Sequence, residues 1–363
     1  MDPVSHLRKL VSINSVFPNE REIGEHCEKY LRSIGFSITR IDLPGGRPNI
    51  IATRGTPSLA FYGHLDTVPV YGKWDSDPHI LTEKEGKLYG IGAGDMKGGI
   101  AALFSALEKS HGDAMVVLCS DEENISLGAN LLVSHPELFS EIELMVSCEF
   151  LEQGDEGGIM LGRRGRAVYE VTVRGTSSHG ATAEKGINAV EKACELILAL
   201  QKFPAKKGAR LGDSTFFVRS FSAESTSLSV PDSAKFQIDA HLVDGQTVEG
   251  CMKEFEIYMK RVYSGFTIDT AKRETPFSMP CYVEPKNRGV KILSKIVKDV
   301  AGKSFFTVGL SVADENVFSR RFPCVVCGPV SANYHSANEW VGKASLMRAS
   351  EIYARLIEKW KGK

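Results

Sequence analysis

Histidine and carboxylate side chains follow directly after several segments that read as buried strands. In chain order they are His64 with Asp66, Glu122 with Glu123, Glu149, and His335. Ligands of open α/β sheets bind outside the carboxyl ends of the strands, so we expect these side chains to converge. One carboxylate at a strand end often only caps a helix, but converging carboxylates repel one another unless a cation lies among them. Histidine with carboxylate is a ligand set for zinc, and less specifically for cobalt or manganese.

A further acidic residue, Asp95, lies in the glycine-rich stretch GIGAGDMKGG. Such a stretch suggests a dinucleotide-binding loop, whose fingerprint is GxGxxG. The fingerprint fails, because its last glycine is replaced by Asp95 in one register and by Lys97 in the next. We therefore interpret Gly98 and Gly99 as packing residues at the start of a helix.

The first half of the chain alternates helical and strand patterns. Helices are predicted over residues 20–33, 96–109 and 127–133. Short strands are predicted at 36–41, 49–53 and 58–63, and buried strands at 115–119 and 144–148. Buried strands that alternate with helices indicate an α/β fold, in which a mostly parallel sheet has helices on both faces.

The pattern changes after Gly165. Residues 166–174 alternate between apolar and polar side chains, which is typical of a half-exposed strand. A helix (187–203), two strands (215–223 and 227–243), a helix (247–263) and a strand (266–272) follow. This β-α-β-β-α-β order is the ferredoxin-like unit. Because the first pattern resumes near residue 290, we expect a catalytic domain of residues 1–164 and 275–363, interrupted by an inserted ferredoxin-like α+β domain of residues 165–274.

Composition excludes several classes of partner. The 363 residues carry a net charge of −1, whereas nucleic-acid and anionic-membrane partners usually require a basic excess. No apolar run approaches the roughly 18 residues of a membrane span. The segment MDPVSHLRKL lacks the apolar core of a signal peptide. The sequence therefore predicts a cytoplasmic protein that binds neither nucleic acid nor membrane.

Four motifs, in this order, resemble those of the M20 metallopeptidase family. They are GHLDTVP at 63–69, GDMKGG at 94–99, DEE at 121–123, and GPVSANYHSANEW at 328–340. The family includes acetylornithine deacetylase, succinyl-diaminopimelate desuccinylase, aminoacylases and glutamate carboxypeptidases. The resemblance covers the whole chain, including the predicted insertion, and the last motif is most similar to the acetylornithine deacetylase branch.

The resemblance implies a centre of two Zn²⁺ ions, for which Co²⁺ or Mn²⁺ are possible substitutes. Asp95 would bridge the two ions. His64 and Glu149 would complete the ligands of one ion, and His335 and Glu123 those of the other. In relatives the peptide bond after the bridging aspartate is cis.

Two further carboxylates would act without binding metal. The resemblance implies that Asp66 hydrogen-bonds the second ring nitrogen of His64, a contact that fixes the tautomer of a ligating histidine. Glu122 would be the general base, because one of two adjacent glutamates can bind metal while its neighbour stays free. In the implied amide hydrolysis, Glu122 accepts a proton from the attacking water and passes it to the leaving amine.

His179, in the segment GTSSHGATAEKGINAV of the predicted insertion, matches a histidine that in relatives reaches the active site of the partner subunit. It would donate a hydrogen bond to the oxyanion. On this ground we expect a homodimer formed through residues 165–274. The alternative is an ordinary histidine on a surface loop.

Two positions depart from the family's pattern. Relatives often carry an asparagine where SLSVPD has Leu228, and usually an arginine that meets the substrate carboxylate where QIDAHLV has His241. A histidine is a weaker partner for a carboxylate than a bidentate arginine. Arg163, Arg164 and Arg166 are candidate substitutes, although arginines beside a domain hinge are more often structural.

The sequence favours a dinuclear zinc amidohydrolase that removes the acyl group from an N-acyl amino acid, similar to acetylornithine deacetylase. A carboxypeptidase or dipeptidase that cleaves short peptides at the same site is the alternative. A catalytically silent ligand-binding protein is a remote alternative, because a silent site tends to lose its base or a ligand. A two-metal phosphohydrolase would need positive groups or amide nests for phosphate, and the sequence suggests no such loop.

Overall fold

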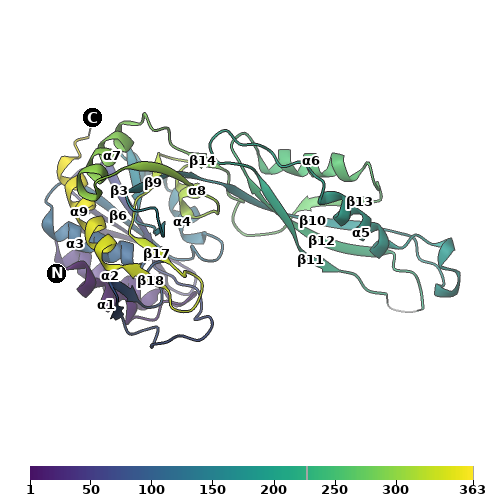
Figure 1. The fold of residues 1–363 in the computed structure, drawn as a ribbon, viewed down its shortest axis with the longest axis horizontal. Coiled ribbons are helices and arrows are strands. Elements are labelled where there is room, and N and C mark those ends of the chain that lie inside the picture. Colours follow the sequence, from purple (N-terminus) through teal and green to yellow (C-terminus); the bar gives the residue numbers. More distant parts are fainter. Residues whose placement is uncertain (226–227, 363) are drawn as a thin grey trace. The chain divides into compact units, whose positions relative to one another are not determined.

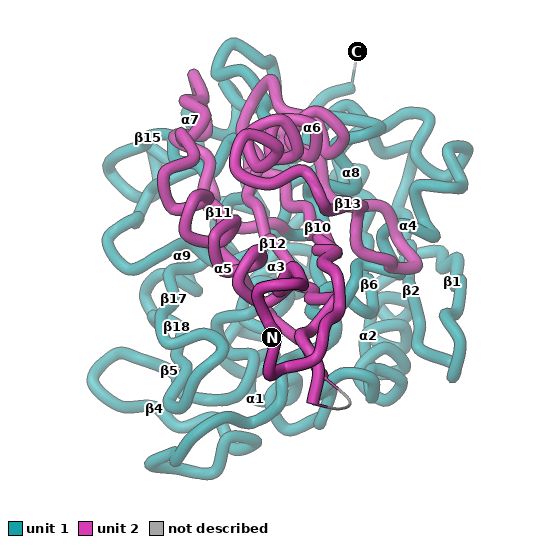
Figure 2. The backbone as a smooth tube through the Cα atoms, turned by 90° about the vertical axis from the view of Figure 1, so that its right-hand side faces the viewer, with its two compact units in different colours: residues 1–162, 282–308, 313–363 teal, residues 163–281, 309–312 magenta. Residues whose placement is uncertain are grey.

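The computed structural model describes residues 1–225 and 228–362, which form two compact units (Figures 1 and 2). Unit 1 comprises Met1–Gly162, Tyr282–Val308 and Ala313–Lys363, and unit 2 comprises Arg163–Cys281 and Gly309–Val312. The predicted insertion, residues 165–274, falls within unit 2. Within the described ranges, every helix is too short or too polar to cross a membrane.

A large sheet forms the centre of unit 1. Its order is β1 (Ser37–Leu43), β2 (Arg47–Arg54), β6 (Ala114–Cys119), β3 (Leu59–His64), β7 (Leu144–Ser147), β16 (Cys324–Val326), β9 (Gly158–Arg163) and β14 (Cys281–Tyr282), with β15 (Phe305–Gly309) paired to β9. The four strands β6, β3, β7 and β16 are parallel, as predicted. The flanking pairs β1–β2, β2–β6 and β16–β9 are antiparallel. A short turn with Gly45 and Gly46 at positive φ joins β1 to β2, and so short a connection permits only antiparallel pairing.

Helices cover both faces of this sheet, as predicted. They are α1 (Pro3–Val11), α2 (Arg21–Ser33), α3 (Lys97–Lys109), α4 (Leu127–Val133), α7 (Arg288–Ala301), α8 (Asp314–Phe318) and α9 (Lys343–Lys359), with the short turn η1 (Pro136–Phe139). Phe61 and Tyr62 are neighbours on β3, so their side chains point to opposite faces. Phe61 contacts Tyr353 of α9, and Tyr62 contacts Phe318 of α8. The two faces of β3 are therefore covered by different helices (Figure 1).

A second, smaller sheet of unit 1 was not predicted. Its order is β4 (Thr82–Lys84), β5 (Lys87–Tyr89), β18 (Trp340–Gly342), β17 (Val330–Ala332) and β8 (Leu151–Glu152). Strands of two or three residues are too short to show a periodic pattern. Their pairing nevertheless brings together three segments that are distant in the sequence.

Unit 2 has the predicted ferredoxin-like order. Its elements are β10 (Gly165–Arg174), η2 (Gly180–Lys185), α5 (Ala189–Leu200), β11 (Thr215–Ser222), β12 (Ser233–Leu242), α6 (Val248–Met259) and β13 (Phe266–Thr270). The antiparallel sheet has the order β11-β12-β10-β13. The strand predicted over 227–243 begins only at Ser233, because Pro231 cannot donate a ladder hydrogen bond. Residues 226 and 227 lie outside the described ranges.

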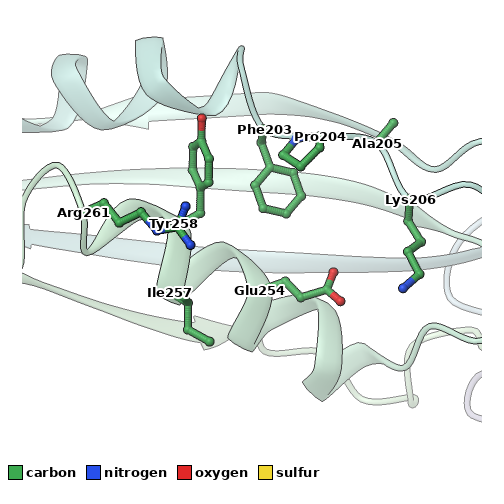
Figure 3. Close-up of a pocket in the computed structure, with 8 residues that line it drawn as sticks. All are labelled: Phe203, Pro204, Ala205, Lys206, Glu254, Ile257, Tyr258 and Arg261. Atoms are coloured by element: carbon green, nitrogen blue, oxygen red, sulfur yellow. The ribbon is translucent and has the colours of Figure 1, made fainter.

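Phe255 of α6 lies at the centre of the unit 2 core. Its ring contacts those of Phe203, Phe216 and Tyr169 at centroid distances of 4.6, 5.2 and 5.8 Å. Phe203 also lines a surface pocket of about 390 Å³ (Figure 3), together with Pro204, Ala205, Lys206, Glu254, Ile257, Tyr258 and Arg261. The pocket contains none of the predicted site residues.

We expect Phe255→Ala to lower the free energy of unfolding by about 3–5 kcal/mol, because it leaves a cavity in this aromatic cluster. Ile257→Ala on the same helix is the control, since Phe255 is 1% exposed and Ile257 60% exposed. The control should change stability by less than about 0.5 kcal/mol. Urea denaturation measures both. Equal effects of the two substitutions would contradict this description of the core.

Candidate active site

The predicted site residues of unit 1 meet at one edge of its large sheet. His64 ends β3, Glu122 and Glu123 follow β6, and Glu149 follows β7. These strands are parallel, so their carboxyl ends reach the same edge. Asp95 precedes α3, and His335 lies in the loop between β17 and β18.

The two oxygens of Asp95 face two different histidines. His64 Nε2 lies 2.9 Å from Asp95 Oδ1 and 3.3 Å from Glu149 Oε1. His335 Nε2 lies 3.3 Å from Asp95 Oδ2 and 3.0 Å from Glu123 Oε2. One ligand atom each of His64, Asp95 and Glu123 lies within 4.8 Å of the others, a possible metal site. The Asp95–Met96 peptide bond is cis.

A hydrogen bond with the main chain of Asp66 fixes the orientation of the His64 ring. Its Nδ1 lies 2.9 Å from the backbone carbonyl oxygen of Asp66, and a carbonyl can only accept, so Nδ1 carries the proton. Nε2 therefore points its lone pair at the two carboxylates unless the ring is charged. Burial disfavours that charge, but the hydrogen bonds with Asp95 and Glu149 outweigh it and hold the pKa of His64 well above its usual value.

Asp66 acts differently from the expectation. Its carboxylate Oδ1 is 3.7 Å from His64 Nδ1, which is too far for a hydrogen bond. The carboxylate instead accepts the backbone N–H groups of Glu122 and Glu123, at 3.3 and 2.9 Å. Asp66 thus orients His64 through its main chain and the Glu122–Glu123 turn through its side chain.

Burial is the largest influence on the carboxylates of the site, and the charges of neighbouring carboxylates add to it. Burial raises the pKa of Glu122 well above its usual value; His64 opposes this rise, and the charge of Glu123 adds to it. Burial and the charge of Asp95 raise the pKa of Glu123 to about 7. The same two causes raise the pKa of Glu149. Asp95 is the exception, because its hydrogen bonds with the two histidines lower its pKa despite burial.

The donor set fits a divalent cation. Glu149 Oε2 is buried and accepts no hydrogen bond from any residue that the structure describes. A buried carboxylate oxygen without a partner is costly, and a cation between the carboxylates would remove both that cost and their repulsion. Imidazole nitrogens and carboxylate oxygens are the ligands that zinc takes in catalytic sites.

A buried ion pair behind the Glu122–Glu123 turn was missed by the sequence reasoning. Arg47 of β2 donates to Asp121 Oδ1 through Nη1 and Nη2, at 2.9 and 2.7 Å. Asp121 has a φ of +81°, and its Oδ2 accepts the N–H of Leu127 at 2.9 Å. The pair anchors both ends of the turn. The only sequence signal is a charged residue at the start of the apolar strand RPNIIATR.

Glu339 is a second residue that was missed. It belongs to the last family motif, but no predicted role was attached to it. Its buried carboxylate accepts the backbone N–H of Asp95 at 2.8 Å. The signal is an acidic residue four positions after His335 in the motif.

The remaining candidates lie in unit 2. His179 is exposed at the start of η2, and Leu228 is also exposed. His241 is half-buried on β12, and burial lowers its pKa. Among the arginines, Arg166 donates to both carboxylate oxygens of Asp239, at 2.9 and 2.6 Å, and Arg164 Nε donates to the Leu211 carbonyl at 3.1 Å. These contacts favour structural roles for Arg164 and Arg166.

Comparison with known sequences identifies the family. The model of Peptidase family M20/M25/M40 matches residues 60–359. A succinyl-diaminopimelate desuccinylase of Sulfurimonas denitrificans is 25% identical over 99% of this chain and 100% of the relative. The succinyl-diaminopimelate desuccinylase of Bordetella petrii is 30% identical over 97% of this chain and 96% of the relative. An acetylornithine deacetylase of Proteus mirabilis is 29% identical over 58% and 57%.

Solved structures share the fold. Aminopeptidase PepT of Bacillus cereus superposes with a TM-score of 0.82 at 19% identity, over 98% of this chain and 97% of the other. A Bacillus subtilis protein described as a dinuclear metal-binding peptidase of the M20 family superposes with a TM-score of 0.75 at 13% identity, over 98% and 96%. At these identities the likeness establishes the fold.

Glu20 provides a pH-dependent test of the buried cluster around Arg47. Its Oε1 lies 3.5 Å from Arg47 Nη1, and burial raises its pKa to about 7. Between pH 5 and 7 the folded protein thus retains a proton that the unfolded chain releases, so stability falls as pH rises through this range. Relative to Glu20→Gln, wild type should lose on the order of 2 kcal/mol between pH 5 and 8.

Urea denaturation at several pH values, with a chelator present in every sample, measures this difference. Both proteins then unfold without metal, and all other titrating groups cancel in the comparison. Parallel stability profiles of the two proteins would contradict the raised pKa of Glu20.

Proposed function

The chain belongs to peptidase family M20/M25/M40, and from this premise we propose that it is a dinuclear zinc amidohydrolase acting on N-acyl amino acids. The observation that carries the proposal is the pair of histidines that face the two oxygens of Asp95, with Glu122 beside them. His64 and Glu149 complete one ligand set, and His335 and Glu123 the other.

Zinc is the ion that this donor set favours, with cobalt or manganese as substitutes. Bound to the two ligand sets, the ions would lower the pKa of a water molecule and polarise the amide carbonyl. The Asp66 carbonyl keeps a proton on His64 Nδ1, which supports the assignment because Nε2, on the side of the two carboxylates, is then the nitrogen that can give up its proton to an ion. Glu149 Oε2, which accepts no hydrogen bond from the described residues, supports it as well.

Glu122 is the general base of the proposal. Adjacent Glu123 lies 3.0 Å from His335 Nε2, whereas no described histidine forms an ion pair with the carboxylate of Glu122. The backbone N–H of Glu122 donates a hydrogen bond to Asp66 Oδ1 at 3.3 Å, which fixes the main chain of Glu122. Burial favours the protonated form of this carboxyl, so Glu122 can hold the proton taken from water until the leaving amine accepts it.

A deacylase is the activity that the relatives favour. Their names specify the removal of a succinyl or an acetyl group. The motif at 328–340, which resembles that of acetylornithine deacetylase, also favours a deacylase. His241 stands where the family usually has an arginine, and burial lowers its pKa, which disfavours the charged form that would attract a carboxylate.

Release of free amine from a mixed panel tests the activity. The panel contains N-acetyl and N-succinyl amino acids together with dipeptides, and the protein is stripped of metal and reloaded with zinc. Zinc-restored cleavage of acyl amino acids supports the proposal. Cleavage of dipeptides alone would make the chain a peptidase, and no cleavage with two bound zinc ions would favour a ligand-binding protein.

The proposed enzyme is a homodimer formed through residues 165–274, in which His179 of the partner subunit stabilises the oxyanion. His179 Nδ1 accepts the backbone N–H of Ala181 at 3.1 Å, so the neutral ring carries its proton on Nε2 and can donate it outward. The edge strand β11 of unit 2 exposes Phe217 and Phe221. Unpaired edges and exposed aromatic rings are typical of association surfaces.

Glu122→Gln should lower kcat by roughly 10³-fold, because the amide cannot accept the proton. It should leave the zinc content unchanged, since Glu122 is not a ligand in this proposal. Steady-state kinetics with metal analysis of the same samples measures both. Glu137→Gln, which removes an exposed carboxylate paired with His135, is the control. Full activity of zinc-loaded Glu122→Gln would refute the proposed base.

Co-expression of His179→Ala with Glu122→Gln chains tests the dimer. In a hybrid dimer, the site that retains Glu122 receives His179 from the other subunit, so one site in two is complete. Random pairing predicts recovery of about a quarter of wild-type kcat from two variants that are each inactive. Sedimentation velocity measures whether the wild-type protein is a dimer in solution. Activity no higher than that of the separate variants, or a monomer, would contradict the shared site.

A further inference from the structure

Glu339 is a buried carboxylate that holds one loop by three backbone hydrogen bonds. The residue is 3% exposed. Its Oε2 accepts the N–H of Gly92, and its Oε1 accepts those of Gly94 and Asp95, each at 2.8 Å. The loop between β5 and α3 is therefore folded around a single side chain.

The glycines of this loop allow the close approach. Gly92 has a φ of +69°, which is the left-handed region that favours glycine. A Cβ on Gly94 would lie 1.8 Å from Ser331 Oγ and 3.3 Å from Glu339 Oε1. Glycine-rich loops with converging N–H groups bind anions. In this loop the acceptor of the N–H groups is the side chain of Glu339, which explains why the stretch is rich in glycine although it lacks the nucleotide-binding fingerprint.

Glu339 also connects the Asp95 loop to the loop of His335. Its own backbone carbonyl accepts the N–H of Gly90 at 3.2 Å. The next residue, Trp340, begins β18 and pairs with Tyr89 of β5. One residue thus ties together the loops that carry Asp95 and His335, on either side of a 3.3 Å contact between these side chains.

We infer that Glu339 is a positioning residue for the metal centre, which sets the backbone of Asp95 so that its two carboxylate oxygens face the two histidines. The inference rests on the proposed dinuclear centre and deepens it. Because both ligand sets share Asp95, loss of the three hydrogen bonds should weaken the binding of both ions. Glu339 itself contacts neither His64 nor His335 within ion-pair distance in the described structure.

Glu339→Gln tests the inference at nearly constant side-chain volume. The amide turns an N–H₂ donor toward at least one loop N–H, so at least one of the three bonds is lost. Glu339→Asp keeps a carboxylate at this position and should therefore weaken zinc binding less than Glu339→Gln does. Glu83→Gln is the control, because Glu83 is a half-exposed carboxylate of the same small sheet, paired with Lys343.

Competition with a chromophoric chelator gives the dissociation constants and the number of bound zinc ions. We expect Glu339→Gln to raise the zinc dissociation constants by about 10–100-fold, the range found for residues that orient metal ligands. The rise in Tm on adding zinc should shrink accordingly. Glu339→Asp should show a smaller change, and Glu83→Gln none. If Glu339→Gln does not fold, Glu339→Asp against Glu83→Gln decides the question.

A purely structural role gives a different result. It would lower the Tm of the metal-free and zinc-loaded proteins equally and leave zinc affinity at the wild-type value, which overturns the inference alone. Absence of zinc binding by wild type would instead refute the dinuclear centre, and the inference with it. The two failures are therefore distinguishable in one set of titrations.

Discussion

Mutual repulsion of buried carboxylates at the ends of parallel strands is the constraint on which this structure depends. Asp95, Glu122, Glu123 and Glu149 meet two imidazoles at the edge formed by β3, β6 and β7. Protons offset part of this repulsion. Hydrogen bonds with Asp95 and Glu123 raise the pKa of His335 to about 10, and burial together with the charge of Asp95 raises that of Glu123 to about 7. Divalent cations would replace these protons, so metal and protons compete for one set of atoms.

The fold meets this constraint with backbone N–H groups and with carboxylates that lie outside the proposed ligand set. Asp66 holds the N–H groups of Glu122 and Glu123, and Glu339 holds that of Asp95. Asp121, paired with Arg47, closes the turn from behind. Asp66 and Glu339 thus fix the main chain of site residues directly, whereas Asp121 fixes the chain that follows the Glu122–Glu123 turn through the N–H of Leu127.

The parts of this account that the sequence predicted are those carried by local patterns. Apolar runs identified the parallel strands β3, β6 and β7. The four motifs supplied the histidines and carboxylates that meet at the sheet edge except Glu149, which was found because it follows the buried strand predicted at 144–148. Contacts between distant segments could not be predicted. The small sheet has strands of two or three residues, the role of Glu339 depends on a loop some 240 positions away, and Arg47 meets Asp121 only in the folded chain. Asp66 was correctly predicted to contact His64 Nδ1, but the contact is made by its backbone carbonyl, while its carboxylate accepts the N–H groups of Glu122 and Glu123.

Anomalous diffraction at the zinc edge, from crystals of the zinc-loaded protein, tests the central claim most directly. The account predicts two peaks of similar height in unit 1, one beside His64 and Glu149 and the other beside His335 and Glu123. Asp95 should supply one oxygen to each ion at about 2.0–2.2 Å. A single peak, or two peaks that do not share Asp95, would contradict the claim that these carboxylates form a dinuclear centre.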